Sequence, residues 1–209
     1  MRHSFTLLLI AISITATSTE AQTVLQNDDL VDFGSATIQA GFVAGESGAS
    51  WLTTPCSGQI TAVRIVWLSL LGGQGNTLGE AIRIHEAGTF PVPGTLLADL
   101  AGPVLTDGFE NEFTLPVPIA VQSGQTFVVS FQFLNAPPAL GPSLVTDTSG
   151  CMVGRNGIFA IPPSAWLSAC LLGVSGDFAI RAVVDCGTPE IFTDGFESGD
   201  TDAWSATAP

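Results

Sequence analysis

The sequence lacks lysine and tyrosine altogether, and its 209 residues include only five arginines and two histidines. Acidic residues number 19, so the formal net charge is −14. A surface with this charge repels phosphate backbones and anionic lipid headgroups, which excludes nucleic-acid binding. An excess of acidic residues is typical of a protein that stays soluble outside the cell. Binding of divalent cations is the more specific alternative interpretation.

Histidine is scarce enough to limit the possible catalytic chemistry. Without residues 1–21 the chain keeps one histidine, His85, so a nucleophile with a base beside it would have to use that residue. His85 alternates with isoleucines in the stretch 79–88, which predicts an exposed strand residue rather than a base. The stretches "GESGA" and "GVSGD" do not fit the Gly-x-Ser-x-Gly pattern of a serine nucleophile.

Long apolar runs are absent after the first 21 residues. The run "FTLLLIAISI" follows Arg2 and His3, and small residues occupy the peptidase positions Thr19 and Ala21. This pattern predicts a signal peptide over 1–21, cleaved after Ala21, and therefore an exported protein. An uncleaved anchor is the alternative, which the short run makes less favourable. No membrane span is predicted in the mature chain.

Cysteine occurs four times, and free thiols rarely persist in exported proteins. Three pairings of four cysteines are possible. We favour Cys56–Cys186, which would tie an early strand to the last one, together with Cys151–Cys170, which would close a local loop. No CxxC or CxxH pair is present, so disulfides are favoured over a zinc site.

Helical periodicity is absent after the signal peptide, and two-residue alternation replaces it. In the stretch 59–71, Val63, Ile65 and Trp67 fall on one face and Arg64 on the other. This alternation, punctuated by Gly, Pro, Asn and Asp, predicts an all-β fold, a two-sheet antiparallel β-sandwich. Strands are predicted at 59–71, 79–88, 111–121, 124–133 and 176–186, with weaker ones at 38–44, 51–55, 143–148 and 165–172. The stretch 90–100 predicts a proline-punctuated connection that runs into a short strand, and Pro116 and Pro118 mark 111–121 as an edge strand or an irregular extension.

Alternation also predicts which residues enter the core. The inward positions of the later strands are expected to be Phe113, Leu115, Val117 and Ile119, then Phe127, Val129, Phe131 and Phe133, then Phe178, Ile180, Ala182 and Val184.

The two ends of the mature chain differ from its body. Residues 22–36 predict a partly ordered lead-in, and residues after Cys186 have too few alternating apolar positions for another strand. We therefore predict a sandwich domain with its lead-in at 22–186 and a C-terminal appendage at 187–209. "TDGFE" occurs in the appendage and at 106–110, where an Asp-Gly pair between apolar runs predicts a tight turn. Shared turn chemistry explains the repeat better than duplication.

The appendage resembles a short C-terminal segment that closes many secreted bacterial proteins of otherwise unlike sequence. The resemblance covers 194–205, "DGFESGDTDAWS". It implies a sorting or surface-association role, with docking of the tail's aromatic side chains on the sandwich as the alternative. The matching positions are Asp194, Gly195, Phe196, Glu197, Gly199 and Trp204.

The body resembles jelly-roll modules of exported bacterial proteins with unknown or adhesive function. The stretches that carry this resemblance are "GQITAVRIVWLSL", "EAIRIHEAGTFPVPGTLLADL", "VQSGQTFVVSFQF" and "GDFAIRAVV". It implies jelly-roll connectivity and a binding or display role rather than catalysis.

These observations favour a non-catalytic exported binding or surface-display module. Its partner would be a glycan or another cell-surface component, with carbohydrate the most plausible ligand. Sugar sites on sandwiches commonly combine an exposed tryptophan with polar side chains. The predicted ligand face is Arg64, Arg83, His85, Arg181, Trp51 and Trp166.

Two other chemistries remain open. A secreted polysaccharide hydrolase could use two carboxylates without histidine. The candidate acids are Glu80, Glu86, Asp99, Glu110, Glu112, Asp147 and Asp177.

Calcium prefers clustered carboxylate and carbonyl oxygens, but the acidic turns show no calcium-loop spacing. We therefore predict no cofactor, with structural calcium as the alternative. The weak metal candidates are Asp28, Asp29, Asp32, Asp200 and Asp202.

Overall fold

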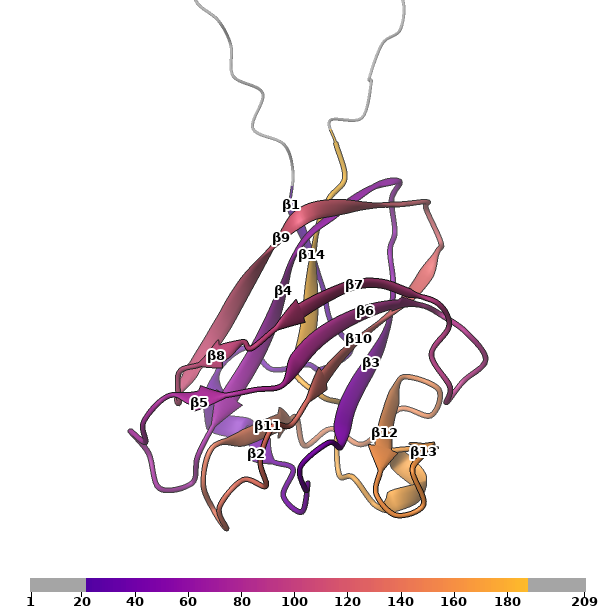
Figure 1. Cartoon of the computed structure of the whole chain (residues 1–209). Coiled ribbons are helices and arrows are strands. Elements are labelled where there is room, and N and C mark those ends of the chain that lie inside the picture. Colours follow the sequence, from indigo (N-terminus) through magenta and orange to yellow (C-terminus); the bar gives the residue numbers. More distant parts are fainter. Residues whose placement is uncertain (1–21, 188–209) are drawn as a thin grey trace, which may run out of the picture.

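The computed structural model describes residues 22–187, which form two antiparallel sheets packed face to face (Figure 1). The signal peptide predicted at 1–21 and residues 188–209 of the appendage lie outside the described residues. The first and last described residues lie at the same end of the sandwich, because Gln22 pairs with Asp185.

Sheet I contains six strands around the long strand β4, which has β14 on one side and β9 on the other. Its strand β1 is an edge strand and pairs with β14. The members are β1 (Gln22–Leu25), β14 (Ile180–Asp185), β4 (Gly58–Leu68), β11 (Ser143–Thr146), β2 (Thr37–Ile38) and β9 (Phe109–Val121).

Sheet II also contains six strands, in the order β13-β12-β3-β10-β6-β7. Its members are β13 (Ala165–Ser168), β12 (Asn156–Ala160), β3 (Ser47–Thr53), β10 (Thr126–Gln132), β6 (Ala81–Glu86) and β7 (Leu96–Ala101). A small two-stranded sheet pairs β5 (Thr77–Leu78) with β8 (Val104–Leu105), and single 3₁₀ turns lie at Phe33–Ser35 and Cys170–Leu172.

The core lies between the two sheets and is built by the alternating side chains that the sequence predicts. Trp67 of β4 is fully buried and contacts Phe131 and Phe133 with ring centroids 5.1 and 5.9 Å apart. Burying one residue in two from each facing strand removes enough apolar surface from water to hold two sheets together. The antiparallel two-sheet sandwich is confirmed, and its jelly-roll connectivity stays a prediction.

The structure differs from the sequence pattern at three places. The lead-in, predicted to be partly ordered, begins with a strand, because Gln22–Leu25 pairs along its whole length with β14. Strand β12 was not foreseen in the Gly-rich stretch where it lies. Val117 is 72% exposed rather than inward, because the pairing of β9 with β4 shifts register between Ile60 and Ala62, opposite Pro116 and Pro118. Prolines cannot donate to the ladder, so the alternation breaks there.

The turn predicted from "TDGFE" is present at Asp107–Gly108, where Gly108 has a φ of 80°. The Asp107 carboxylate is buried and accepts hydrogen bonds from the backbone N–H groups of Ser69 and Gln74, both at 2.7 Å. The internal copy of the pentapeptide therefore fixes the loop after β4.

The structure contains the disulfides Cys56–Cys186 and Cys151–Cys170, which is the favoured pairing. The first joins the β3–β4 connection to the end of β14. The second joins the loop before β12 to the 3₁₀ turn after β13. Each holds in place a segment that borders the site described next.

Candidate functional site

The predicted ligand face does not exist as one surface, because its polar residues are divided between two sheets. Arg64 and Arg181 are opposite each other in register on the outer face of sheet I. Arg64 pairs with Glu112 at 2.7 Å, and Arg181 binds Asp28 and, at 2.8 Å, Glu110. These arginines are already engaged by carboxylates.

Arg83 and His85 lie instead on the outer face of sheet II. Arg83 donates to the Gln132 side chain at 2.7 Å and pairs with Asp99 at 3.4 Å. His85 Nδ1 lies 3.3 Å from the Gly94 carbonyl oxygen. Burial lowers the pKa of His85 below its ordinary value, so the ring is neutral at physiological pH.

Trp51 and Trp166 share that face of sheet II and are in contact, with rings nearly perpendicular and centroids 6.3 Å apart. Trp51 is only 6% exposed, its Nε1 donates to the Ala87 carbonyl at 2.8 Å, and Phe90 packs against its edge. A side chain at Gly157 would collide with the Trp51 ring, so glycine is required beneath it. Trp51 is thus a packing residue, and Trp166 is the more exposed member of the pair.

The metal candidates that are described have other roles. The Asp28 carboxylate binds Arg181, and the Asp32 carboxylate accepts from the Gly34 N–H at 2.8 Å. Asp29 donates its backbone N–H to Asp147. Among residues 22–187 no group of three or more His, Cys, Asp or Glu side chains could hold a metal ion. Asp200 and Asp202, like the six tail positions 194–197, 199 and 204, lie outside the described residues.

The candidate catalytic acids do not gather in a recess. Glu110 and Glu112 pair with arginines, and Asp147 and Asp177 lie buried in the interior. Glu80 adjoins β6 and Glu86 ends it, whereas Asp99 lies on β7. Glu46 lines one recess and Asp99 lines another, and neither recess has a second carboxylate.

A large recess opens where the edges of the two sheets meet, between β1 and β3. Strand β12 pairs with β3 only as far as Ser50, and the Arg155 carbonyl then accepts from the Trp51 N–H at 2.8 Å. Gly154, with a φ of 89°, turns the chain away. The last part of β3 therefore runs on without a neighbouring strand on that side, facing the free edge of β1.

We call this recess the β1–β3 groove. Its volume is about 660 Å³, which suits a ligand of several rings. Its lining residues are Thr23, Val24, Leu25, Gln26, Asn27, Trp51, Leu52, Thr53, Pro55, Thr126, Val153, Gly154 and Arg155.

Hydroxyl and amide groups are spread along the groove. Thr53 and Thr126 are opposite each other on β3 and β10, with their hydroxyl oxygens 2.8 Å apart. The Asn27 amide donates to the Trp51 carbonyl at 3.0 Å, and its oxygen accepts from Arg155 Nη1 at 3.1 Å. These groups present both donors and acceptors, which is the chemistry that recognises a polyhydroxylated ligand.

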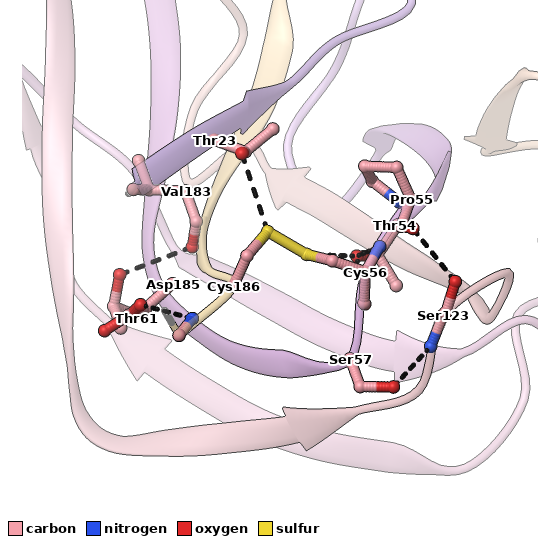
Figure 2. The surroundings of a disulfide bond; sticks show 11 residues. Thr23, Thr54, Pro55, Cys56, Ser57, Thr61, Ser123, Val183, Asp185 and Cys186 are labelled. Carbon is pink, nitrogen blue, oxygen red and sulfur yellow. Dashed lines mark hydrogen bonds between the residues drawn. A yellow bond between two sulfur atoms is a disulfide. The ribbon is translucent and has the colours of Figure 1, made fainter. Parts of the chain in front are cut away.

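One end of the groove is held by the Cys56–Cys186 disulfide (Figure 2). Cys186 Sγ lies 3.5 Å from the Thr23 hydroxyl oxygen, and the adjacent Pro55 carbonyl accepts from Ser123 Oγ at 2.9 Å. The other end is held by Asn27, which bridges β1's continuation to β3. The groove is therefore a preformed feature of the fold, with constraints at both ends.

Of the groove residues, only Trp51 was among the predicted site residues. Thr53 and Thr126 were invisible as a pair, because their contact depends on the β3–β10 register. Arg155 carried a usable signal: it is the one mature arginine outside the predicted strands, within a glycine-flanked turn inside the Cys151–Cys170 loop.

No family model matches this chain, and no curated protein matches it in sequence. Among solved structures it is similar to the cysteine protease and lectin-like domains of Cwp84, a surface layer associated protein of Clostridium difficile. That likeness has a TM-score of 0.51 at 13% identity and covers 84% of this chain but only 38% of the other. This likeness agrees with the β-sandwich fold that the antiparallel sheets of this chain form. Within residues 22–187, no helix has the length and apolarity needed to cross a membrane.

Proposed function

We propose that this protein is an exported, non-catalytic binding module for cell-surface or extracellular glycans, and that the β1–β3 groove is its binding site. The main support for this proposal is the groove itself. It is a large, open recess that is held at both ends and lined by hydroxyl, amide and guanidinium groups. No carboxylate lines it, so it lacks the paired acids of a glycosidase.

Three further observations support this proposal. The similar solved structure includes a lectin-like domain of a surface layer associated protein. Two disulfides fit an oxidising compartment outside the cytoplasm, in agreement with the predicted signal peptide at 1–21. The jelly-roll modules that the body resembles are treated as binding or display domains, which agrees with a groove built for ligands.

The proposal is tested by affinity electrophoresis of the mature chain in gels that contain dextran, galactan, arabinoxylan, polygalacturonate or bacterial cell-wall polysaccharide. At least one of these polymers is expected to retard the protein. The double variant Thr53→Val/Thr126→Val removes the paired hydroxyls of β3 and β10 at nearly constant shape, and we expect retardation to weaken about tenfold. Val117→Thr, on the far side of the sandwich, is the matched control and should migrate as the parent does.

Three outcomes would overturn the proposal: no retardation by any polymer, equal retardation of the double variant, or release of new reducing ends from a polymer that binds. The last outcome would favour the hydrolase.

For the appendage, we propose that residues 187–209 direct or retain the protein at the cell surface. Support comes from the resemblance of 194–205 to a segment shared by unlike exported proteins. Deletion of residues 187–209 should shift the protein from the surface fraction to the medium. Fractionation of native cells that express the chain with and without these residues measures this shift. An unchanged distribution would contradict this role.

A further inference from the structure

The arginines of the described chain fall into two classes. Arg64, Arg83 and Arg181 each have a carboxylate within 4.0 Å, in the pairs described above. Arg155 has no carboxylate within that distance in residues 22–187, although the protein carries 19 acidic residues. In so acidic a protein, a lone exposed guanidinium beside a groove requires an explanation.

The surroundings of Arg155 fix its position at the groove. Its carbonyl accepts from Trp51, its N–H donates to the Met152 carbonyl at 3.2 Å, and its Nη1 donates to Asn27. The loop that carries it is closed by the Cys151–Cys170 disulfide. A guanidinium has five N–H donors in a planar fork, so most of them stay available to a ligand.

The nearest acids in the described chain have other partners and form no ion pair with Arg155. Asp28 follows Asn27 directly but is buried and bound to Arg181. Asp177 lies behind the loop, where its Oδ1 accepts from the Met152 N–H and the Asn156 amide. Burial raises the pKa of Asp177 above its ordinary value, whereas the charge of Arg155 acts in the opposite direction. The two side chains form no ion pair within 4.0 Å. Arg155 is the one charged residue among those that line the groove.

We infer that the ligand of the β1–β3 groove is an acidic saccharide whose anionic group pairs with Arg155. This inference rests on the proposed function and specifies its ligand class. A carboxylate of a uronic acid can accept two parallel N–H bonds from the guanidinium, and a sulfate ester offers the same acceptor geometry. The hydroxyl and amide groups along the groove would then bind the neutral parts of the sugar.

The net charge of −14 does not prevent such binding but predicts its salt dependence. At physiological ionic strength charges beyond about 8 Å are largely screened, so the local contact with Arg155 dominates. Removal of Arg155 would leave only long-range repulsion between the protein and the acidic sugar. The sign of the salt effect on affinity should therefore reverse in a variant without this charge.

The experiment is isothermal titration of the mature chain with trigalacturonate, its methyl ester and a sulfated galactan trisaccharide, at 0.05 and 0.5 M NaCl. Methyl esterification removes the charge and retains the ring and its hydroxyls. We expect trigalacturonate to bind about tenfold more tightly than its ester at low salt. In Arg155→Gln this preference should disappear, and the residual affinity for the acid should rise with salt.

Two further variants distinguish the effect of the Arg155 charge from that of its planar geometry, and from a general effect of losing an arginine. Arg155→Lys keeps the charge but loses the planar fork, so it should retain only part of the preference. Arg83→Gln removes an arginine that is already paired on sheet II and should leave the preference unchanged. If the sulfated trisaccharide binds more tightly than trigalacturonate, and only with Arg155 present, the anionic group is a sulfate ester.

The failure of this inference differs from the failure of the proposed function. Equal binding of the acid and the ester, or a preference that persists in Arg155→Gln, would overturn the role of Arg155 and leave a neutral glycan groove. If no acidic or neutral saccharide binds, and Thr53→Val/Thr126→Val changes nothing, the proposed function fails as well.

Discussion

On each of two sides of this sandwich, a recess lies where the edges of the two sheets meet, but one recess is polar and the other is apolar. On one side the edges of the sheets meet at β1 and β3 and form a polar groove. On the other side they meet at β7 and β9 and form a recess of about 410 Å³, lined mainly by Leu, Ala, Val, Ile and Pro. The polar groove is lined by hydroxyl, amide and guanidinium groups, whereas the one charged residue among those that line the apolar recess is Asp99, which pairs with Arg83.

The difference lies in what holds each side. Both disulfides and the Asn27 bridge act on the segments that border the polar groove. The apolar recess has no such bracing, and its strand β9 carries Pro116 and Pro118, which cannot donate backbone hydrogen bonds to another strand. Covalent constraint is therefore concentrated around the polar groove, which agrees with its proposed role as a binding site.

The largest expected effect comes from removal of the bond that braces the polar side. Cys56→Ala/Cys186→Ala opens a link between residues 130 apart, and chain entropy predicts a loss of about 5 kcal/mol of unfolding free energy. Cys151→Ala/Cys170→Ala opens a link between residues 19 apart, with about 3 kcal/mol expected. Urea unfolding measures both, and equal losses would contradict this account of the two bonds.

Trp51 offers the next effect, since it is a wall of the groove and buried within sheet II. Trp51→Ala should cost about 3–5 kcal/mol of unfolding free energy, from the lost contacts and the cavity left behind. Trp166→Ala should cost clearly less, because its ring is more exposed. Thermal unfolding followed by circular dichroism compares the two. A larger loss at Trp166 would contradict the conclusion that Trp51 is the more deeply packed of the two tryptophans.

A pH-dependent effect is expected at Asp177, which holds the Arg155 loop through Met152. Burial raises its pKa in the folded state above the ordinary value of 3.8. The folded protein therefore keeps a proton that the unfolded chain has released, so this residue's contribution to stability falls as the pH rises from about 3.8 through the raised pKa. Relative to the parent, Asp177→Asn should gain stability across that interval in urea titrations. A difference independent of pH would exclude this linkage.

The smallest effect is expected on the apolar side. Val117 was predicted to point inward but is largely exposed, so Val117→Thr should change the unfolding free energy by less than about 0.5 kcal/mol. Leu115→Ala, two residues earlier and buried, is the contrast and should cost about 2–5 kcal/mol. Similar losses at the two positions, measured by urea unfolding, would mean that the apolar side is packed more deeply than the structure shows.

The sequence determines much of this fold because its strongest signals are local. Alternation placed Trp67, Phe131 and Ile180 in the core, and the Asp-Gly pair located the turn at Asp107. Where tertiary pairing overrides local pattern, prediction failed. Val117 follows a run that looks regular, and only the register shift against β4 reveals its exposure.

The site was harder to predict than the fold for the same reason. Asn27 and Trp51 are far apart in sequence, and their hydrogen bond exists only because β1 joins sheet I beside the end of β3. Arg64 and Arg83 have the same strand context in sequence, yet the topology places them on different sheets. Residue type and spacing can indicate which side chains face outward, but not which strands become neighbours.

The paired ends of the described chain have a mechanical consequence. A force applied at Gly187 reaches Cys186 first and passes through the disulfide to Cys56, at the junction of the two sheets. The load therefore bypasses the hydrogen bonds of β14, which would otherwise separate one at a time. A molecule held by its C-terminal end could then withstand shear from a flowing medium or a moving cell while its groove keeps its shape.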